Sequence, residues 1–328
     1  MKPFVVLGIL LGVAGLLTLL LGVRDAGPLD VWQAFAAFDV TNPNHLAIRS
    51  IRMPRLIAGI TAGAGLGMAG CIMQAVTRNP LADPGLLGVN SGAAFAVVFG
   101  ALLFGSSDAS LVSLLAFPGA GLAAVSVFLV GGGLRGDAGP VRLALAGIAL
   151  NALLLSLVSA LVLWRSDSLD VFRFWVVGSL AEAGARPLGA MACLALLGAG
   201  ISLLSAPRVE ALSLGGALAR GLGTHPGRVQ LAALVAVTLM TGAAVSVAGP
   251  IAFLGLMVPP IARRIGPHAL RAELVAAALL GAIVLLLADT AGRMVFAPSE
   301  VRVGIMTGLL GAPVFILIAR RLRPGAVA

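Results

Sequence analysis

Charged side chains are scarce in this chain, and lysine is the scarcest of them. Only 11% of the 328 residues are charged, and Lys2 is the one lysine. A phosphate-binding loop of the G-x-x-x-x-G-K-[ST] type needs a lysine after a glycine-rich turn, so this chain has none. If ATP drives the protein's work, another chain must bind the ATP and its Mg, and we expect no cofactor on this one.

Histidine and cysteine are also rare. The three histidines show no metal-ligand spacing, and no Ser/His/Asp arrangement stands out. Cys71 and Cys193 lie inside apolar runs without a nearby Cys or His, which argues against a disulfide framework and a zinc site. We therefore predict no metal site and no enzyme activity.

Apolar residues take the place of the missing charge. Hydrophobic residues make up 59% of the chain and the mean hydropathy is +1.08, whereas about a quarter of the residues of a soluble domain are charged. The formal charge of +9 comes from basic residues in short loops between apolar runs, not on one face, which argues against nucleic acid as a partner. The composition predicts an all-α polytopic membrane protein.

Apolar runs of about 20 residues, the length that crosses the hydrocarbon core, predict about ten transmembrane helices. The first run is too long for a secretory signal and no small-residue cleavage site follows it, so we expect a retained helix. The eighth is short and holds three prolines, so it is either a broken helix packed inside the protein or a misplaced boundary. The runs are 4–22, 55–76, 85–104, 111–134, 141–164, 187–205, 229–248, 250–264, 272–291 and 303–320.

The loops between the runs predict the orientation. An even number of crossings places both termini on one side of the membrane. With that side cytoplasmic, the inside loops hold thirteen of the 22 lysines and arginines, in line with the positive-inside rule. Trp32, Trp164 and Trp175 fall at or beside segments that this topology places outside, as interfacial anchors would. We expect both termini in the cytoplasm.

The second run carries a glycine stripe. Gly59, Gly63 and Gly67 recur every four residues, so they leave a strip without side chains along one face of a helix. Such a strip lets a neighbouring helix approach closely where lipid removes the hydrophobic driving force. Two glycine pairs with the same spacing predict further close contacts: Gly88 with Gly92, and Gly304 with Gly308.

Six motifs in order along the chain resemble the FecCD family. Those proteins are permease subunits of ATP-driven importers for iron-siderophores, haem and cobalamin. Two positions depart from the family's pattern, which commonly has His at Pro260 and Pro at Arg302. The motifs are R-M-P-R at 52–55, M-Q-A-V-T-R-N-P-L-A-D-P-G-L-L-G-V-N-S-G at 73–92, F-W-V-V-G-S-L at 174–180, G-P-I-A-F-L-G-L-M-V-P at 249–259, L-L-A-D at 286–289 and V-G-I-M-T-G-L-L-G-A-P-V-F at 303–315.

The resemblance implies the architecture and the partners. Residues 1–328 would form a single transmembrane permease domain with the type II ABC importer fold. The family works as a pair of permease subunits with two cytoplasmic ATPases and a periplasmic or lipid-anchored substrate-binding protein. The expected location is the bacterial cytoplasmic (inner) membrane, and the sequence leaves open whether the permease pair is a homodimer or includes a paralogue.

The resemblance also assigns a docking role to three arginines. Arg52, Arg55 and Arg293 match positions that meet acidic residues on the binding protein, and guanidinium groups suit bidentate pairing with carboxylates. The alternative is interfacial snorkelling and, for Arg293, an i to i+4 pair with Asp289. In that case Asp289 would be a structural counter-ion.

A cytoplasmic gate is the second implied site. In the family, positions in the loop after the second helix belong to this gate together with the start of the fifth helix. Pro80 and Pro84 hold the preceding residues out of the helical region, so the loop is short and stiff. A simple capped helix connection is compatible with the same sequence. The gate positions are Asn79, Pro80, Leu81, Leu143, Ala144 and Leu145.

The third implied site is the segment 207–228, which would couple the permease to the ATPase. Its apolar and polar residues predict a short helix pair on the cytoplasmic side, outside the membrane, and a surface amphipathic helix is the alternative. The coupling positions are Glu210, Ala211, Leu212, Leu214, Gly215, Ala219, Arg220 and Gly223.

Together these features predict a permease that imports an iron-siderophore or a related metal chelate by alternating access. An importer of cobalamin or haem from the same family is the nearest alternative. A secondary transporter or channel without an ATPase is the alternative from another class. It would need ionisable residues inside the membrane, and Asp289 is the one acidic residue well inside a run.

Overall fold

The computed structural model describes residues 2–22, 26–105, 108–133, 140–164, 172–173, 175–221, 223–265 and 269–321. Helices dominate these residues, and none of them forms a strand. Ten helices correspond to the ten predicted runs, which confirms the all-α architecture. The end of the run 111–134, Phe174 of the third motif and the histidine at position 268 lie outside the described residues. The ten helices are α1 (Lys2–Leu20), α4 (Met53–Thr77), α5 (Val89–Phe104), α6 (Ala109–Val130), α7 (Pro140–Trp164), α9 (Leu188–Ser213), α11 (Pro226–Ala248), α12 (Leu254–Ile265), α13 (Leu270–Val295) and α14 (Val303–Arg321).

Helix length separates α12 from the others. Within the described part of the chain, seven helices are long and apolar enough to cross a membrane, and α5 and α14 add shorter apolar helices. The 12 residues of α12 extend about 18 Å, less than the roughly 30 Å of hydrocarbon. Gly249 and Phe253 just before it have positive φ, and residues 254–259 are buried. The eighth run is therefore a broken helix packed inside the protein.

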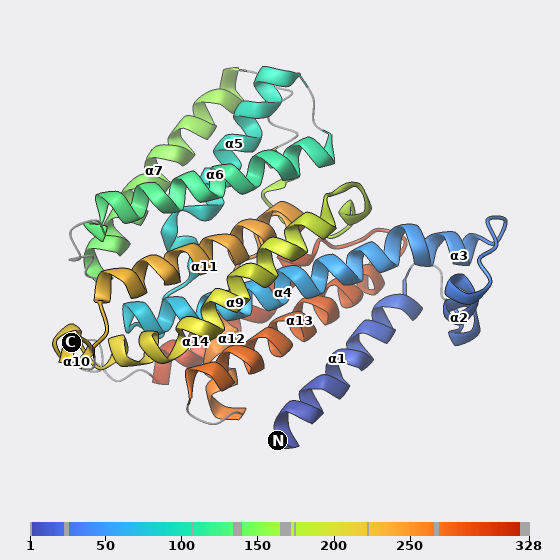
Figure 1. Ribbon diagram of the computed structural model, residues 1–328. Helices are drawn as coiled ribbons and strands as arrows, with labels where there is room; N and C mark the ends of the chain where they lie inside the picture. The colour runs from blue at the N-terminus through green and yellow to red at the C-terminus, as the bar shows by residue number, and fades with distance from the viewer. Residues whose placement is uncertain are drawn as a thin grey trace.

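Helix α4 is the centre of the fold. It packs against α13, α11, α9 and α12, and most of its buried residues are small. The helices α5, α6 and α7 form a second group, which joins the first mainly where α6 meets α11 (Figure 1). Helix α1 lies at the edge of the molecule against α13 (Figure 1).

Glycine explains how α4 approaches its neighbours so closely. A Cβ added at Gly63 would lie 2.5 Å from the Gly281 carbonyl oxygen on α13. A Cβ at Gly67 would lie still closer to the Ala277 carbonyl oxygen, and one at Gly70 would overlap the Gly255 carbonyl on α12. The backbones themselves are in contact at these turns, which only glycine permits.

The other predicted glycine pairs each contribute one close contact. Gly92 on α5 and Gly119 on α6 lie against each other's carbonyl groups, and Gly304 lies against the Val177 carbonyl oxygen. Gly88 instead starts α5 with φ +72°, and Gly308 has no atom within 4 Å of an added Cβ. Spacing alone therefore overstated the number of packing glycines.

Shorter elements complete the chain. The segment between α1 and α4 forms α2, α3 and a π turn that runs into α4, and α2 and α3 project beyond the ends of the neighbouring helices (Figure 1). The shorter elements are α2 (Pro28–Ala36), α3 (Pro43–Ala47), η1 (Ile48–Arg52), η2 (Pro84–Leu87), η4 (Ala183–Ala185) and α10 (Gly216–Gly221).

Helix directions define two ends of the subunit. One end, which we call the outer end, holds the start of α4, the end of α13 and the start of α14. The 25 residues of α4 extend about 37 Å, and the Arg78 that follows contacts the end of α9. That end, the cytoplasmic end of the predicted topology, also holds the start of α1 and the end of α14 (Figure 1).

Candidate functional site

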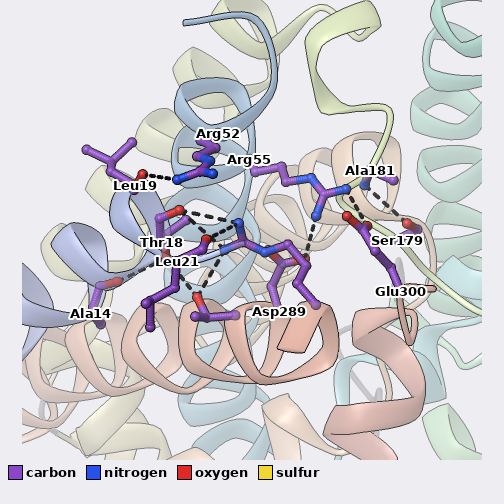
Figure 2. A network of polar contacts seen from close by, with 12 residues as sticks. Ala14, Thr18, Leu19, Leu21, Arg52, Arg55, Ser179, Ala181, Asp289 and Glu300 are labelled. Atoms are coloured by element: carbon purple, nitrogen blue, oxygen red, sulfur yellow. Dashed lines mark hydrogen bonds and ion pairs between the residues drawn. The ribbon is translucent and has the colours of Figure 1, made fainter. Parts of the chain in front are cut away.

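The outer end carries a buried cluster of charged residues. Arg55 Nη2 lies 2.6 Å from Glu300 Oε2 and its Nη1 lies 3.9 Å from Asp289 Oδ1 (Figure 2). Arg293 Nε lies 3.2 Å from Asp289 Oδ2. The i to i+4 pair that the spacing of Asp289 and Arg293 allows is therefore present. Because Asp289 also faces Arg55, one carboxylate serves two guanidinium groups.

Two of the arginines also bind the end of α1. Arg52 Nη1 donates hydrogen bonds to the carbonyl oxygens of Leu19 (2.6 Å) and Leu20 (2.8 Å), and Arg293 Nη1 donates to those of Leu21 (3.0 Å) and Thr18 (3.3 Å). Carbonyl groups in the last turn of a helix lack intrahelical partners and carry the negative end of its dipole. Since α1 has no basic residue in its own last turn, these arginines supply the missing donors.

Burial sets a condition on the docking prediction. Arg52, Arg55 and Arg293 are 5%, 4% and 3% exposed, and each binds atoms of its own subunit. Docking of a binding protein through these side chains stays a prediction, and it requires the guanidinium groups to leave these partners. In the arrangement seen here, they join α1, α4, α13 and the loop before α14.

The predicted gate loop is built from side-chain caps. Asn79 Oδ1 accepts a hydrogen bond from the Leu81 amide (2.9 Å), and Asp83 Oδ1 accepts one from the Gly85 amide (2.7 Å) at the start of η2. Burial raises the pKa of the Asp83 carboxyl above its ordinary value of 3.8, although the Gly85 hydrogen bond opposes the shift. The loop is therefore held rigid by its own side chains, as its two prolines predict.

The start of α7 lies beside this loop. A Cβ added to Gly147 of α7 would overlap the Leu86 carbonyl oxygen of η2. The three gate positions on α7 face different directions: Leu143 is buried, Ala144 is half-buried and Leu145 is 61% exposed. The structure therefore brings the two gate segments to one end of the subunit and leaves Leu145 free on its surface.

The predicted coupling segment differs from the expected helix pair. Its first half is not a separate helix, because α9 continues through Pro207 to Ser213. A proline there removes the hydrogen bond to the Leu203 carbonyl, and Arg271 Nε donates to that oxygen instead (3.2 Å). The second half is α10, which packs against α9 and α11.

The coupling positions divide by exposure. Arg78, at the end of α4, donates a hydrogen bond to the Leu212 carbonyl oxygen (2.7 Å) and so ties the segment to the central helix. Leu212 and Ala219 are buried and Ala211 and Gly215 are half-buried, whereas Glu210, Leu214, Arg220 and Gly223 are exposed.

One polar network was missed by the sequence analysis. Gln74 of α4 donates to the carbonyl oxygens of Leu256 (3.3 Å) and Ala82 (3.4 Å) and accepts a hydrogen bond from Arg263 of α12. Arg263 also lies 3.9 Å from Glu273 of α13. The available signal was an amide side chain inside an otherwise apolar run, because buried polar groups need partners.

Comparison with known proteins agrees with this architecture. A model of the FecCD transport family matches residues 10–321. The chain belongs to the FecCD transport family. The resemblance read from the motifs is thereby confirmed, and with it a transport subunit without enzyme activity of its own.

The relatives match over almost the whole chain. The ferric enterobactin transport system permease protein FepD of Escherichia coli (strain K12) is 41% identical over 97% of this chain and 94% of its own. The iron(3+)-hydroxamate import system permease protein FhuB of Bacillus subtilis (strain 168) is 39% identical over 96% and 82%. A solved structure described as an inward-facing conformation of a metal-chelate type ABC transporter is 27% identical, covers 98% of this chain and 99% of its own, and superposes with a TM-score of 0.82. The fold is that of a type II ABC importer permease.

Membership of this family implies partners in general terms. An ABC transporter permease works with an ATPase, a second permease and a substrate-binding protein. It is the membrane-spanning subunit of a bacterial import system. The roles that the resemblance implies for the arginine cluster, the gate loop and the coupling segment of this chain stay predictions.

Proposed function

We propose that this chain is the permease subunit through which an importer moves a ferric siderophore into the cytoplasm by alternating access. The observation that carries the proposal is the 41% identity to a ferric enterobactin permease over 97% of the chain. Relatives described as hydroxamate and Fe(3+)-citrate permeases align over similar shares of the chain. The shared cargo class is ferric iron held by an organic chelator, which favours this substrate over cobalamin or haem.

The proposed assembly follows the family pattern. Two permease subunits, two cytoplasmic ATPases and a periplasmic or lipid-anchored binding protein would act together in the bacterial cytoplasmic membrane. The binding protein would dock at the outer end, where Arg52, Arg55 and Arg293 support the surface, and the ATPase at the opposite end. ATP and Mg would bind on the ATPase alone.

The coupling segment has a surface suited to an ATPase. Leu214 and Leu218 are 63% and 62% exposed at the end of α9 and on α10, beside the exposed Arg220. This apolar pair lies close to the hydrogen bond from Arg78 to Leu212. A push on α10 would therefore reach both α9 and the central helix α4.

The state of Asp289 supports an ATP-driven mechanism over a secondary transporter. An ion-coupled transporter needs an acidic residue free to bind its ion within the membrane. Asp289 is 5% exposed and lies between Arg55 and Arg293. Its charge is already compensated, so it would act as a structural counter-ion.

Uptake in proteoliposomes tests the proposal. The chain would be reconstituted with its ATPase and binding protein, and entry of radiolabelled ferric enterobactin measured. We expect uptake only when ATP is present. The double variant L214A/L218A should bind the ATPase at least tenfold more weakly, since burial of one leucine is worth about 1.5–3 kcal/mol. The matched control L196A/L197A, at positions of similar exposure within the membrane span of α9, should leave uptake unchanged. Equal uptake without ATP would exclude the proposed function.

A further inference from the structure

Two adjoining cavities lie at the cytoplasmic end, where α9, α10 and α11 meet. The smaller, of about 310 Å³, is lined by Ser205 and Arg208 among others. The larger, of about 670 Å³, has apolar walls that include Phe128 and Leu231. Three residues line both cavities, so the two form one divided hollow: Thr224, His225 and Arg228.

The hollow is strongly cationic. Arg208, Arg220 and Arg228 line it, and neither cavity has an aspartate or glutamate among its described lining residues. Arginines elsewhere, such as Arg55 and Arg263, pair with carboxylates, whereas no ion pair between described residues includes any of these three. A concave surface with three uncompensated positive charges attracts an anionic group.

Apolar stripes lead from the membrane to two of these charges. Leu204, one turn before Arg208 on α9, is 75% exposed. On α11, Leu231 and Val235 are 49% and 41% exposed and share the face of Arg228, because residues three and four apart are neighbours on a helix. Each guanidinium group therefore lies at the cytoplasmic end of exposed apolar side chains on a membrane-spanning helix.

We propose that Arg208 and Arg228 bind the phosphate headgroup of an anionic phospholipid from the cytoplasmic leaflet. The acyl chains would lie against the stripes of Leu204 and Leu231, and the phosphate would accept hydrogen bonds from both guanidinium groups in the hollow. Basic pockets between transmembrane helices on this side of a membrane suit anionic lipid headgroups. The apolar approach distinguishes a lipid from a soluble anion, which would need only the charges.

The bound lipid would join the end of α9 to the start of α11. Because α10 lies between these helices in the chain and packs against both, the lipid would restrain the coupling segment. That consequence rests on the proposed function, whereas lipid binding itself does not. Failure of ATP-driven uptake and failure of lipid binding are therefore separate results.

Native mass spectrometry of the full-length chain in a neutral detergent tests the site. Phosphatidylglycerol and phosphatidylcholine with the same acyl chains would be titrated in parallel. We expect tighter binding of phosphatidylglycerol and a roughly 30-fold loss in the variant R208Q/R228Q, which corresponds to about 1 kcal/mol for each basic side chain. The control R264Q/R320Q removes two exposed charges from the same end outside both cavities and should bind phosphatidylglycerol within about twofold of the original chain.

A conservative variant and three alternative results complete the test of lipid binding. The variant R208K/R228K keeps both charges and should keep most of the preference, which preserves the test if R208Q/R228Q does not fold. Equal binding of the two lipids, or phosphatidylglycerol binding unchanged in R208Q/R228Q, would overturn the proposal. Displacement of the lipid by millimolar inorganic phosphate would assign the hollow to a free anion instead. A loss of dimer mass in R208Q/R228Q without a change in lipid binding would assign it to a second copy of the chain.

Discussion

Replacing single glycines of α4 by alanine should separate packing from helix propensity. A Cβ at Gly63 would lie 2.5 Å from the Gly281 carbonyl oxygen, whereas ordinary carbon to oxygen contacts lie at about 3.3–3.6 Å. The helices α4 and α13 would therefore have to separate by about 1 Å at this turn. Overpacking of this kind costs about 1–3 kcal/mol, against about 1 kcal/mol gained when alanine replaces glycine in a helix.

The matched control is Gly12 on α1. A Cβ added there has no atom within 4 Å, so Gly12→Ala should show the propensity gain alone. The difference in unfolding free energy between Gly12→Ala and Gly63→Ala is then the packing contribution, about 1–3 kcal/mol. Gly59→Ala should fall between them, because its Cβ would meet the end of the Leu286 side chain, which can rotate away.

Unfolding by heat or by a denaturing detergent, in the same mild detergent for every variant, measures this series. The expected order of stability is Gly12→Ala, the unchanged chain, Gly59→Ala and then Gly63→Ala. Equal stability of Gly12→Ala and Gly63→Ala would refute the inferred backbone contact between α4 and α13. A Gly59→Ala variant less stable than Gly63→Ala would show that side chains, not backbones, limit the approach.

Three further predictions follow from polar contacts. Asp289→Asn should lower the unfolding free energy by about 3–5 kcal/mol because it leaves the buried guanidinium group of Arg293 without its carboxylate, while Glu300→Gln, at an exposed position, should cost far less in the same unfolding assay. Burial raises the pKa of Asp83 in the folded state, so the folded protein should lose stability as the pH rises above about 4 and the carboxyl loses its proton. Asp83→Asn keeps an oxygen that accepts the Gly85 hydrogen bond, and a plot of its melting temperature against pH should lack this decrease. Arg78→Gln removes the donor to Leu212 and should reduce ATP-driven uptake more than ATP hydrolysis, and a proportional loss of both would contradict the coupling path.

The number and placement of the helices could be predicted because both depend on local properties. An apolar run near 20 residues has few alternatives to a membrane-spanning helix, and each of the ten runs corresponds to a helix. The end of α9 was misjudged because Pro207 usually ends a helix. The compensating donor, Arg271, lies on α13, and no local pattern connects it with α9.

In the candidate site, too, contacts between residues close in sequence could be predicted, whereas contacts between distant segments could not. The pair of Asp289 and Arg293 follows from an i to i+4 spacing and was foreseen as one of two possibilities. The bonds from Arg52 and Arg293 to the last turn of α1 were not foreseen, since they join residues 32 to 275 positions apart. The close contact of Gly70 with Gly255 was missed because α12 had to be placed beside α4 before any spacing could indicate it.

The same contacts limit how the subunit can move. Gly63 and Gly67 hold the backbone of α4 against α13 at successive turns, and a slide of one residue, about 1.5 Å, would drive the side chains beside these glycines into the carbonyl groups of α13. Sliding is therefore blocked, and Arg55 fixes the outer end of the same pair through Asp289. A displacement that enters α4 at Arg78 must reach the outer end as a rigid movement of α4 together with α13. The group of α5, α6 and α7 joins the rest mainly through the contact between α6 and α11, so we expect relative motion in this fold to occur between that group and the rest.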